Sequence, residues 1–136
     1  MKKLTSLALL VFLIILTAIV PVHASRPTPV SGYFEITVPR VDDCEILQVH
    51  GYFDGELAEC VRGAGGSSVG YFVGTAGGYE GTLVFNLVSF GHTDFGQWTI
   101  LEGTRELANL RGQGVSYTDG TYDGHVHFNP RAQSGE

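Results

Sequence analysis

Two histidines near the end of the chain have a spacing that metal ions use. In the tripeptide His125-Val126-His127, an extended backbone places both imidazoles on one face of a strand and the valine on the other. Imidazole is a common ligand of zinc, copper and nickel. A solvent-facing pair behind a buried valine gives the same pattern. We therefore treat His125 and His127 as candidate metal ligands, with His50 and His92 as further donors if the fold brings them close.

Several aromatic side chains are candidate ligand-binding residues. Trp98, Tyr117 and Tyr79 could line an apolar cavity, together with Asn86, the amide within the apolar run 81–90. Aromatic side chains on strands also fill protein cores. The sequence leaves both roles open for these residues.

Two further patterns are reminiscent of catalysis but lack its context. Residues 66–70 read Gly-Ser-Ser-Val-Gly, the G-x-S-x-G pattern of a nucleophilic serine, which requires a strand–turn–helix setting in a large α/β sheet. Here a strand-like segment follows the serines, so we interpret them as part of a flexible loop. Glu80, Glu102 and Glu106 could include a general acid or base, but such chemistry requires a pair with split pKa values. We therefore name no catalytic residue and expect no cofactor.

The chain begins like a secreted protein. Three residues with two lysines precede the apolar run 4–20, and Val22 and Ala24 occupy the −3 and −1 positions of a cleavage site. The alternative is an uncleaved anchor, because about 17 apolar residues are near the lower limit for a membrane span. We predict a cleaved signal peptide over 1–24 and a secreted or extracytoplasmic protein.

Export changes the interpretation of the two cysteines. In an oxidising compartment Cys44 and Cys60 are expected to form a disulfide. A tight hairpin turn at Asp54-Gly55 would instead place Cys60 opposite Val49 and leave the thiols too far apart to bond. Either the disulfide forms and 54–60 is a wider bend, or the hairpin forms and the thiols are free. We favour the disulfide.

The charge balance excludes two classes of partner. Residues 25–136 hold all 14 acidic residues, six arginines and no lysine, which gives them a formal charge of −8 against −6 for the whole chain. Nucleic-acid binding requires a basic surface, and anionic membranes attract basic segments. We therefore expect no nucleic acid as a partner, and no membrane contact beyond the signal peptide.

The pattern of glycine and proline predicts an all-β domain. Residues 40–129 contain no proline, which central strands exclude, and glycines interrupt them every few residues. Short strands at this spacing form a sandwich or a small barrel. We expect this domain over 32–129, an extended linker over 25–31 and a disordered tail over 130–136. The predicted strands are 32–38, 44–53, 60–63, 69–74, 78–90, 96–102, 113–118 and 122–128.

Two segments add detail to this outline. The run 81–90 is apolar on both faces, which indicates a strand covered on both sides; a homo-oligomer is therefore one hypothesis. The segment 104–111 has helical potential, since Thr104 can cap it, two leucines share a face and Gly112 can end it. We expect one short helical turn there, against one end of the sheet.

Four blocks of sequence together resemble a known group of proteins. They resemble a family of uncharacterised prokaryotic proteins whose fold is similar to the β-barrel of allene oxide cyclases and dirigent proteins. The resemblance covers roughly residues 32–128 and implies a single closed antiparallel barrel of about eight strands. It implies no site residues, because no catalytic residue of the cyclases can be matched to this chain. The blocks are Gly-Tyr-Phe-Asp-Gly-Glu-Leu (51–57), Gly-Thr-Leu-Val-Phe (81–85), Gly-Gln-Trp-Thr-Ile-Leu-Glu-Gly-Thr (96–104) and Glu-Leu-Ala-Asn-Leu-Arg-Gly-Gln-Gly (106–114).

These observations support one leading hypothesis and two alternatives. The leading hypothesis is a secreted, non-catalytic β-barrel that binds a small apolar ligand or a protein partner. The first alternative is an isomerase or cyclase that acts in the barrel cavity, similar to the allene oxide cyclases. The second is a structural, oligomer-forming envelope protein. A cavity lined by aromatic side chains with one carboxylate or histidine inside would favour the enzyme.

Overall fold

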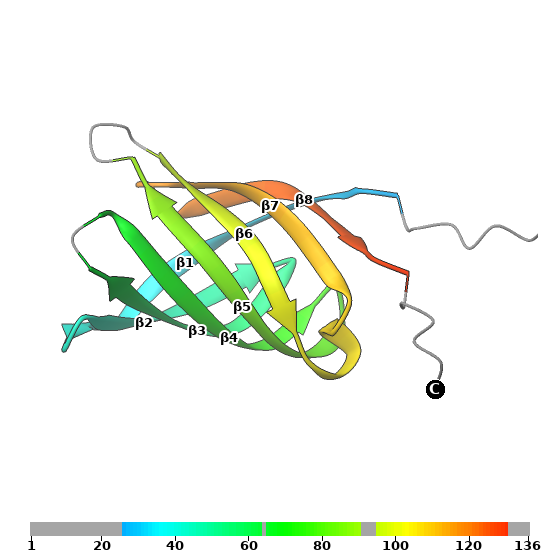
Figure 1. Ribbon diagram of the computed structural model, residues 1–136, viewed down its shortest axis with the longest axis horizontal. Coiled ribbons are helices and arrows are strands. Elements are labelled where there is room, and N and C mark those ends of the chain that lie inside the picture. Colours follow the sequence, from blue (N-terminus) through cyan, green and yellow to red (C-terminus); the bar gives the residue numbers. More distant parts are fainter. Residues whose placement is uncertain (1–25, 64, 91–94, 131–136) are drawn as a thin grey trace, which may run out of the picture.

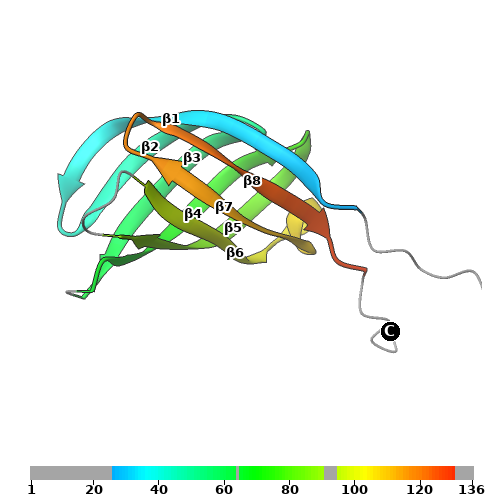
Figure 2. The ribbon, with the colours of Figure 1, turned by 90° about the horizontal axis from the view of Figure 1, so that it is seen from above.

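The described part of the chain is a closed antiparallel β-barrel. The computed structural model describes residues 26–63, 65–90 and 95–130. Within them each strand pairs with its sequence neighbours, and the last strand closes the barrel against the first (Figures 1 and 2). The prediction of a single all-β barrel of about eight strands is confirmed, with a barrel in place of a sandwich. The strands are β1 (Thr28–Val41), β2 (Cys44–Gly51), β3 (Phe53–Arg62), β4 (Ser67–Ala76), β5 (Tyr79–Ser89), β6 (Phe95–Gly103), β7 (Leu110–Tyr117) and β8 (Thr121–Phe128).

The first strand begins inside the predicted linker. Residues 28–30 pair with residues 124–126 of β8, and Val30 is buried in the core. The register with β2 starts at Gly32, so Pro29 has a paired strand on one side only, where a proline is tolerated. The linker predicted over 25–31 is therefore wrong from residue 28 onward. The predicted signal peptide (1–24) and the tail beyond Pro130 lie outside the described residues.

The β2–β3 hairpin decides between the two arrangements of the cysteines. Cys44 pairs directly with Cys60, and the two form a disulfide. The chain turns at Gly51, whose φ of +108° lies in a region that glycine adopts without steric cost. The predicted disulfide is confirmed. The accompanying bend over 54–60 is wrong, because these residues belong to a regular strand.

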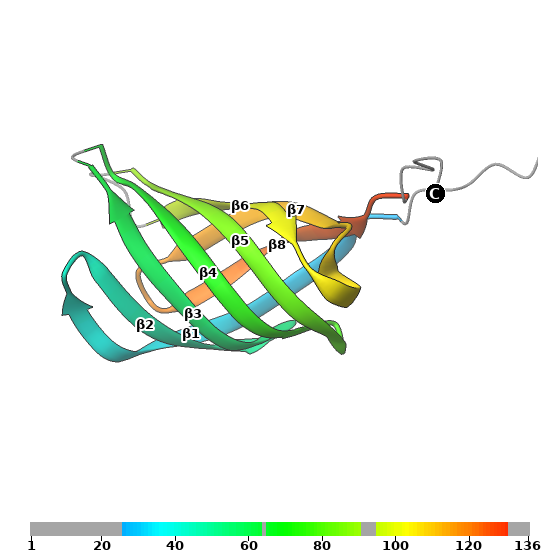
Figure 3. The same ribbon diagram turned by 60° about the horizontal axis from the view of Figure 1, so that its bottom comes forward.

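The helical segment is shorter than predicted and lies against one end of the barrel (Figure 3). Only η1 (Arg105–Leu107) forms, as a 3-10 turn. Thr104 makes no side-chain cap; its hydroxyl accepts a hydrogen bond from the Thr82 N–H at 3.2 Å. Gly112 does not end the turn but lies within β7. Leu107 is fully buried, so the expected packing against a sheet end is confirmed. Among the described residues, no helix has the length and hydropathy to span a membrane.

Inward-facing aromatic rings meet in the middle of the barrel. The ring centroid of Phe53 lies 5.5 Å from that of Phe85 and 5.7 Å from that of Trp98, both edge to face. This is a favoured geometry for aromatic pairs. Phe72 and Tyr122 lie 6.0 Å and 5.7 Å from the same ring. The core is therefore built around Phe53.

The outer face of β5 is partly covered by its neighbours in the sheet. Val84, Asn86 and Val88 point outward and are each half-buried, while Leu83 and Phe85 face the core. A second subunit over this face, as the homo-oligomer hypothesis requires, stays a prediction.

Candidate functional site

The disulfide register determines which side chains enter the barrel. Successive residues of a strand point to opposite faces. Leu47 is buried inside the barrel and Cys44 is paired on the outer face, so Glu45 points inward. Its partner across the ladder is Glu59, which therefore also points inward. The hairpin thus brings two carboxylates to the inner wall, at the end of the barrel where β2 starts and β3 finishes.

The barrel holds a small, mainly apolar cavity next to these carboxylates. Its volume is about 90 Å³, which is room for a few waters or one small ring and less than the ~300–1,000 Å³ of most small-molecule pockets. Most of its wall is aromatic or aliphatic, and Glu59 and Ser116 are the polar exceptions besides one tyrosine. The lining residues are Phe34, Leu47, Val49, Phe53, Leu57, Glu59, Phe72, Phe85, Leu87, Trp98, Ser116 and Tyr122.

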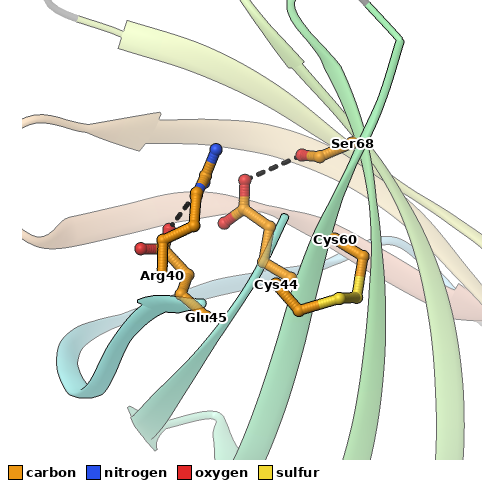
Figure 4. Close-up of a disulfide and its surroundings, with 6 residues drawn as sticks. Arg40, Cys44, Glu45, Cys60 and Ser68 are labelled. Carbon is orange, nitrogen blue, oxygen red and sulfur yellow. Dashed lines mark hydrogen bonds and ion pairs between the residues drawn. A yellow bond between two sulfur atoms is a disulfide. The ribbon is translucent and has the colours of Figure 1, made fainter. Parts of the chain in front are cut away.

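A short polar network lies at the end of this cavity. The Ser68 hydroxyl, which is buried, donates a hydrogen bond of 2.7 Å to Oε1 of Glu59. Beside it Arg40 forms an ion pair of 3.1 Å with Glu45 (Figure 4). The disulfide joins β2 and β3 on their outer face, opposite to Glu45 and Glu59. Of these polar groups, Glu59 lines the cavity.

Tyr122 is a structural part of the cavity wall. Its hydroxyl donates to the backbone carbonyl of His50 at 3.1 Å and accepts from the N–H of Phe53 at the same distance. Burial raises the pKa of the Tyr122 phenol above its ordinary value. Because both of these bonds tie strands together, the hydroxyl is engaged with the protein and not with the cavity.

Of the predicted ligand-binding residues, the structure places one in the cavity. Trp98 lines it, and its indole Nε1–H donates to the carbonyl of Asp123 at 3.2 Å. Tyr79 is exposed and packs its ring against Phe128. Tyr117 lies outside and donates to the Asp123 carboxylate at 3.1 Å, a bond that raises the pKa of the tyrosine. Asn86 points outward from β5. These three residues do not line the cavity.

The candidate metal ligands lie on the outer face of β8. His125 is exposed and His127 half-buried, on either side of the buried Val126. His50 stacks on Tyr33 with ring centroids 4.7 Å apart. Within the described ranges, no group of three or more His, Cys, Asp and Glu side chains has the arrangement of a metal site. His92 lies outside those ranges, so the metal hypothesis stays a prediction.

Sequence reasoning missed the carboxylate that lines the cavity and the serine that donates a hydrogen bond to it. Ser67 and Ser68 begin β4 instead of forming the expected loop. Glu59 is not among the site residues predicted from the sequence. One signal could have revealed it: once Cys44 and Cys60 are bonded across a hairpin on its outer face, alternation places the residue before Cys60 inside the barrel.

A solved bacterial structure has a similar fold. It is a protein of unknown function from the DUF3224 family of Shewanella oneidensis MR-1, at 19% sequence identity and a TM-score of 0.53. The match covers 77% of this chain and 99% of the bacterial one. The chain matches no protein-family model, and no curated protein matches it in sequence. At this identity the likeness shows a shared β-barrel fold and no specific function.

Proposed function

We propose that this chain is an extracytoplasmic binding protein whose barrel holds a small apolar ligand. The observation that carries the proposal is the cavity itself, with an apolar wall and one half-buried carboxylate. Ligand sites commonly combine apolar walls with a few placed polar groups. The Cys44–Cys60 disulfide supports export, because disulfides persist in oxidising compartments. Non-catalytic binding needs no further residue, which fits the small number of polar groups in the cavity.

The single tryptophan gives a direct test of this proposal. Trp98 is the one tryptophan of the chain and lines the cavity, so its fluorescence should respond when a ligand enters. We expect small aromatic compounds to change the emission saturably. Leu87→Phe should fill part of the cavity and weaken binding by about 10-fold or more. Val88→Phe, on the outer face of the same strand, should not. Equal binding by both variants would contradict a site inside the barrel.

Isomerase or cyclase activity is a second candidate, favoured by Glu59 in its apolar surroundings. A carboxylate in such a cavity can accept or deliver a proton to a bound substrate. The cavity volume restricts this chemistry to short substrates. We expect Glu59→Gln to abolish turnover of any such substrate while leaving the stability of the barrel unchanged. Turnover that is unaffected in Glu59→Gln would exclude this role for Glu59.

A further inference from the structure

Two carboxylates, Glu45 and Glu59, lie near the cavity and differ in their partners. Arg40 pairs with Glu45. Among the described residues, the ion pairs do not include Glu59, whose hydrogen-bond partner is the neutral Ser68 hydroxyl. The next cation along β3, Arg62, shares the outward direction of Cys60 and is exposed. In the described part of the chain, Glu59 therefore lines the cavity without an ion-pair partner.

Glu59 retains capacity to accept more hydrogen bonds. A carboxylate has about four acceptor sites on its two oxygens, and the Ser68 hydroxyl uses one of them. The same cavity wall includes Leu57, Leu87 and the hydroxyl of Ser116. A group that enters the cavity and reaches Glu59 would meet a hydrogen-bond acceptor in a mainly apolar wall.

The charge near this end disfavours an anionic ligand. Two aspartates, Asp42 and Asp43, form the turn of the neighbouring β1–β2 hairpin. Residues 25–136, which contain the barrel, have a formal charge of −8. A carboxylate or phosphate on the ligand would be repelled by Glu59, whereas a cation would be attracted and steered toward it.

We propose that the cavity selects a small amphiphile with a protonated amine at one end and a short apolar or aromatic body. The amine would donate to Glu59 beside Ser68, and the body would lie against the rings of Trp98 and Phe85. This inference rests on the proposed function, since it assigns the head group of the same ligand. It predicts a preference among ligands that share one body and differ in one polar group.

A matched ligand series tests this preference with the complete protein. Benzylamine, benzyl alcohol and benzoate share one ring and carry a cationic, a neutral and an anionic group. We expect Trp98 fluorescence titrations near neutral pH to show benzylamine binding about 10-fold or more tightly than benzyl alcohol, and benzoate the weakest. The comparison uses the unmodified chain, so it does not depend on a variant that folds.

Two variants on β3 then assign the preference to one carboxylate. Glu59→Gln keeps the shape and an acceptor for Ser68 but removes the charge, so the amine-to-alcohol ratio should fall to about 1. Glu56→Gln makes the same change in net charge on the exposed outer face and should leave the ratio unchanged. Circular dichroism melting curves check that both variants are folded.

The outcomes separate this inference from the proposed function. If amine and alcohol bind equally, or benzoate binds best, the head-group assignment is overturned while a ligand cavity stands. If the ratio of benzylamine affinity to benzyl alcohol affinity is unchanged in Glu59→Gln, another group binds the amine and the inference fails. If none of the three compounds changes the Trp98 signal, the cavity function itself is overturned, and this inference with it.

Discussion

At the scale of single residues, two glycines leave the space that the only tryptophan occupies. Gly114 of β7 and Gly124 of β8 face each other in the ladder, and Gly114 also pairs with Trp98 of β6. A Cβ on either glycine would overlap the indole ring and a backbone carbonyl of the neighbouring strand. The indole, and with it one wall of the cavity, therefore depends on the absence of two side chains.

This close contact predicts that replacing either glycine with alanine destabilises the barrel. Gly114→Ala and Gly124→Ala should each lower the free energy of unfolding by about 1–3 kcal/mol or more, as expected for overpacking. The entropy that alanine removes from the unfolded chain offsets only about 0.4–1 kcal/mol. Denaturant titration followed by Trp98 fluorescence measures the change. Gly65→Ala, with no atom within 4 Å of its added Cβ, is the control; an equal loss there would refute the explanation.

Tyr122 should cause the barrel to lose stability as the pH becomes alkaline. Burial raises the pKa of its phenol above 10.0, the usual value, so the folded state keeps the proton to higher pH than the unfolded state. The stability from the neutral phenol is complete below about pH 10 and is lost as the pH rises through the folded-state pKa. Urea titrations between about pH 8 and 11 should show this loss.

The matched variant for that experiment is Tyr122→Phe. At neutral pH it should be less stable by about 1–3 kcal/mol, because the Phe53 N–H and the His50 carbonyl lose their partner. Its alkaline loss of stability should be smaller, because the titrating phenol is gone. Parallel curves for both proteins above pH 10 would show that another group causes the loss.

At the scale of elements, η1 closes the barrel end away from the polar network. Gly81 and Gly103 leave no room for a Cβ against the backbone carbonyls of Thr104 and Leu107, which shows how closely the turn approaches β5 and β6. Thr104 bonds to Thr82 across this contact. Close contacts between backbone atoms and the buried Leu107 hold the turn in place. Glu59, which lines the cavity, lies toward the opposite end of the barrel.

Truncating that leucine should weaken the closure. Leu107 has 0% of its surface exposed, so Leu107→Ala should lower the free energy of unfolding by about 2–5 kcal/mol. Leu101→Ala, at a site with 49% exposure on the neighbouring strand, should change it by less than about 1 kcal/mol. Thermal and denaturant unfolding measure both. Similar losses in the two variants would mean that the turn does not close the core.

The sequence predicts such elements better than it predicts the site they build. Glycine spacing and the lack of proline locate most strands to within a few residues, because turns and strand interiors impose local rules. Thr104 was expected to cap a helix, but its hydroxyl bonds to Thr82, which lies 22 positions earlier. The inward direction of Glu59 likewise depends on pairing with a distant strand. Contacts between distant segments carry no local signature, so these two features required the structure.

At the scale of the whole molecule, the barrel formed by the described residues has no free edge and contains one disulfide. All eight strands are paired on both sides, which removes the exposed edge that would otherwise invite association. The polar end is the place where β1 and β2 project as a hairpin (Figure 3). Cys44 and Cys60 join β2 to β3 at the base of that projection. The disulfide therefore constrains the part of the wall that carries Glu45 and Glu59.

This arrangement predicts a stabilising disulfide that folding does not require. It closes a loop with a sequence separation of 16, which corresponds to about 3 kcal/mol of stabilisation in the chain-entropy model. The double variant Cys44→Ser, Cys60→Ser should therefore melt more than ~10 °C lower yet keep the circular dichroism spectrum of a β-barrel, because the β2–β3 ladder and the aromatic core persist. The intact mass with and without reductant shows whether the bond is present in the starting protein. An unchanged melting temperature in the bonded protein and the double variant would show that the β2–β3 ladder alone fixes the end of the barrel, and that the disulfide adds nothing to it.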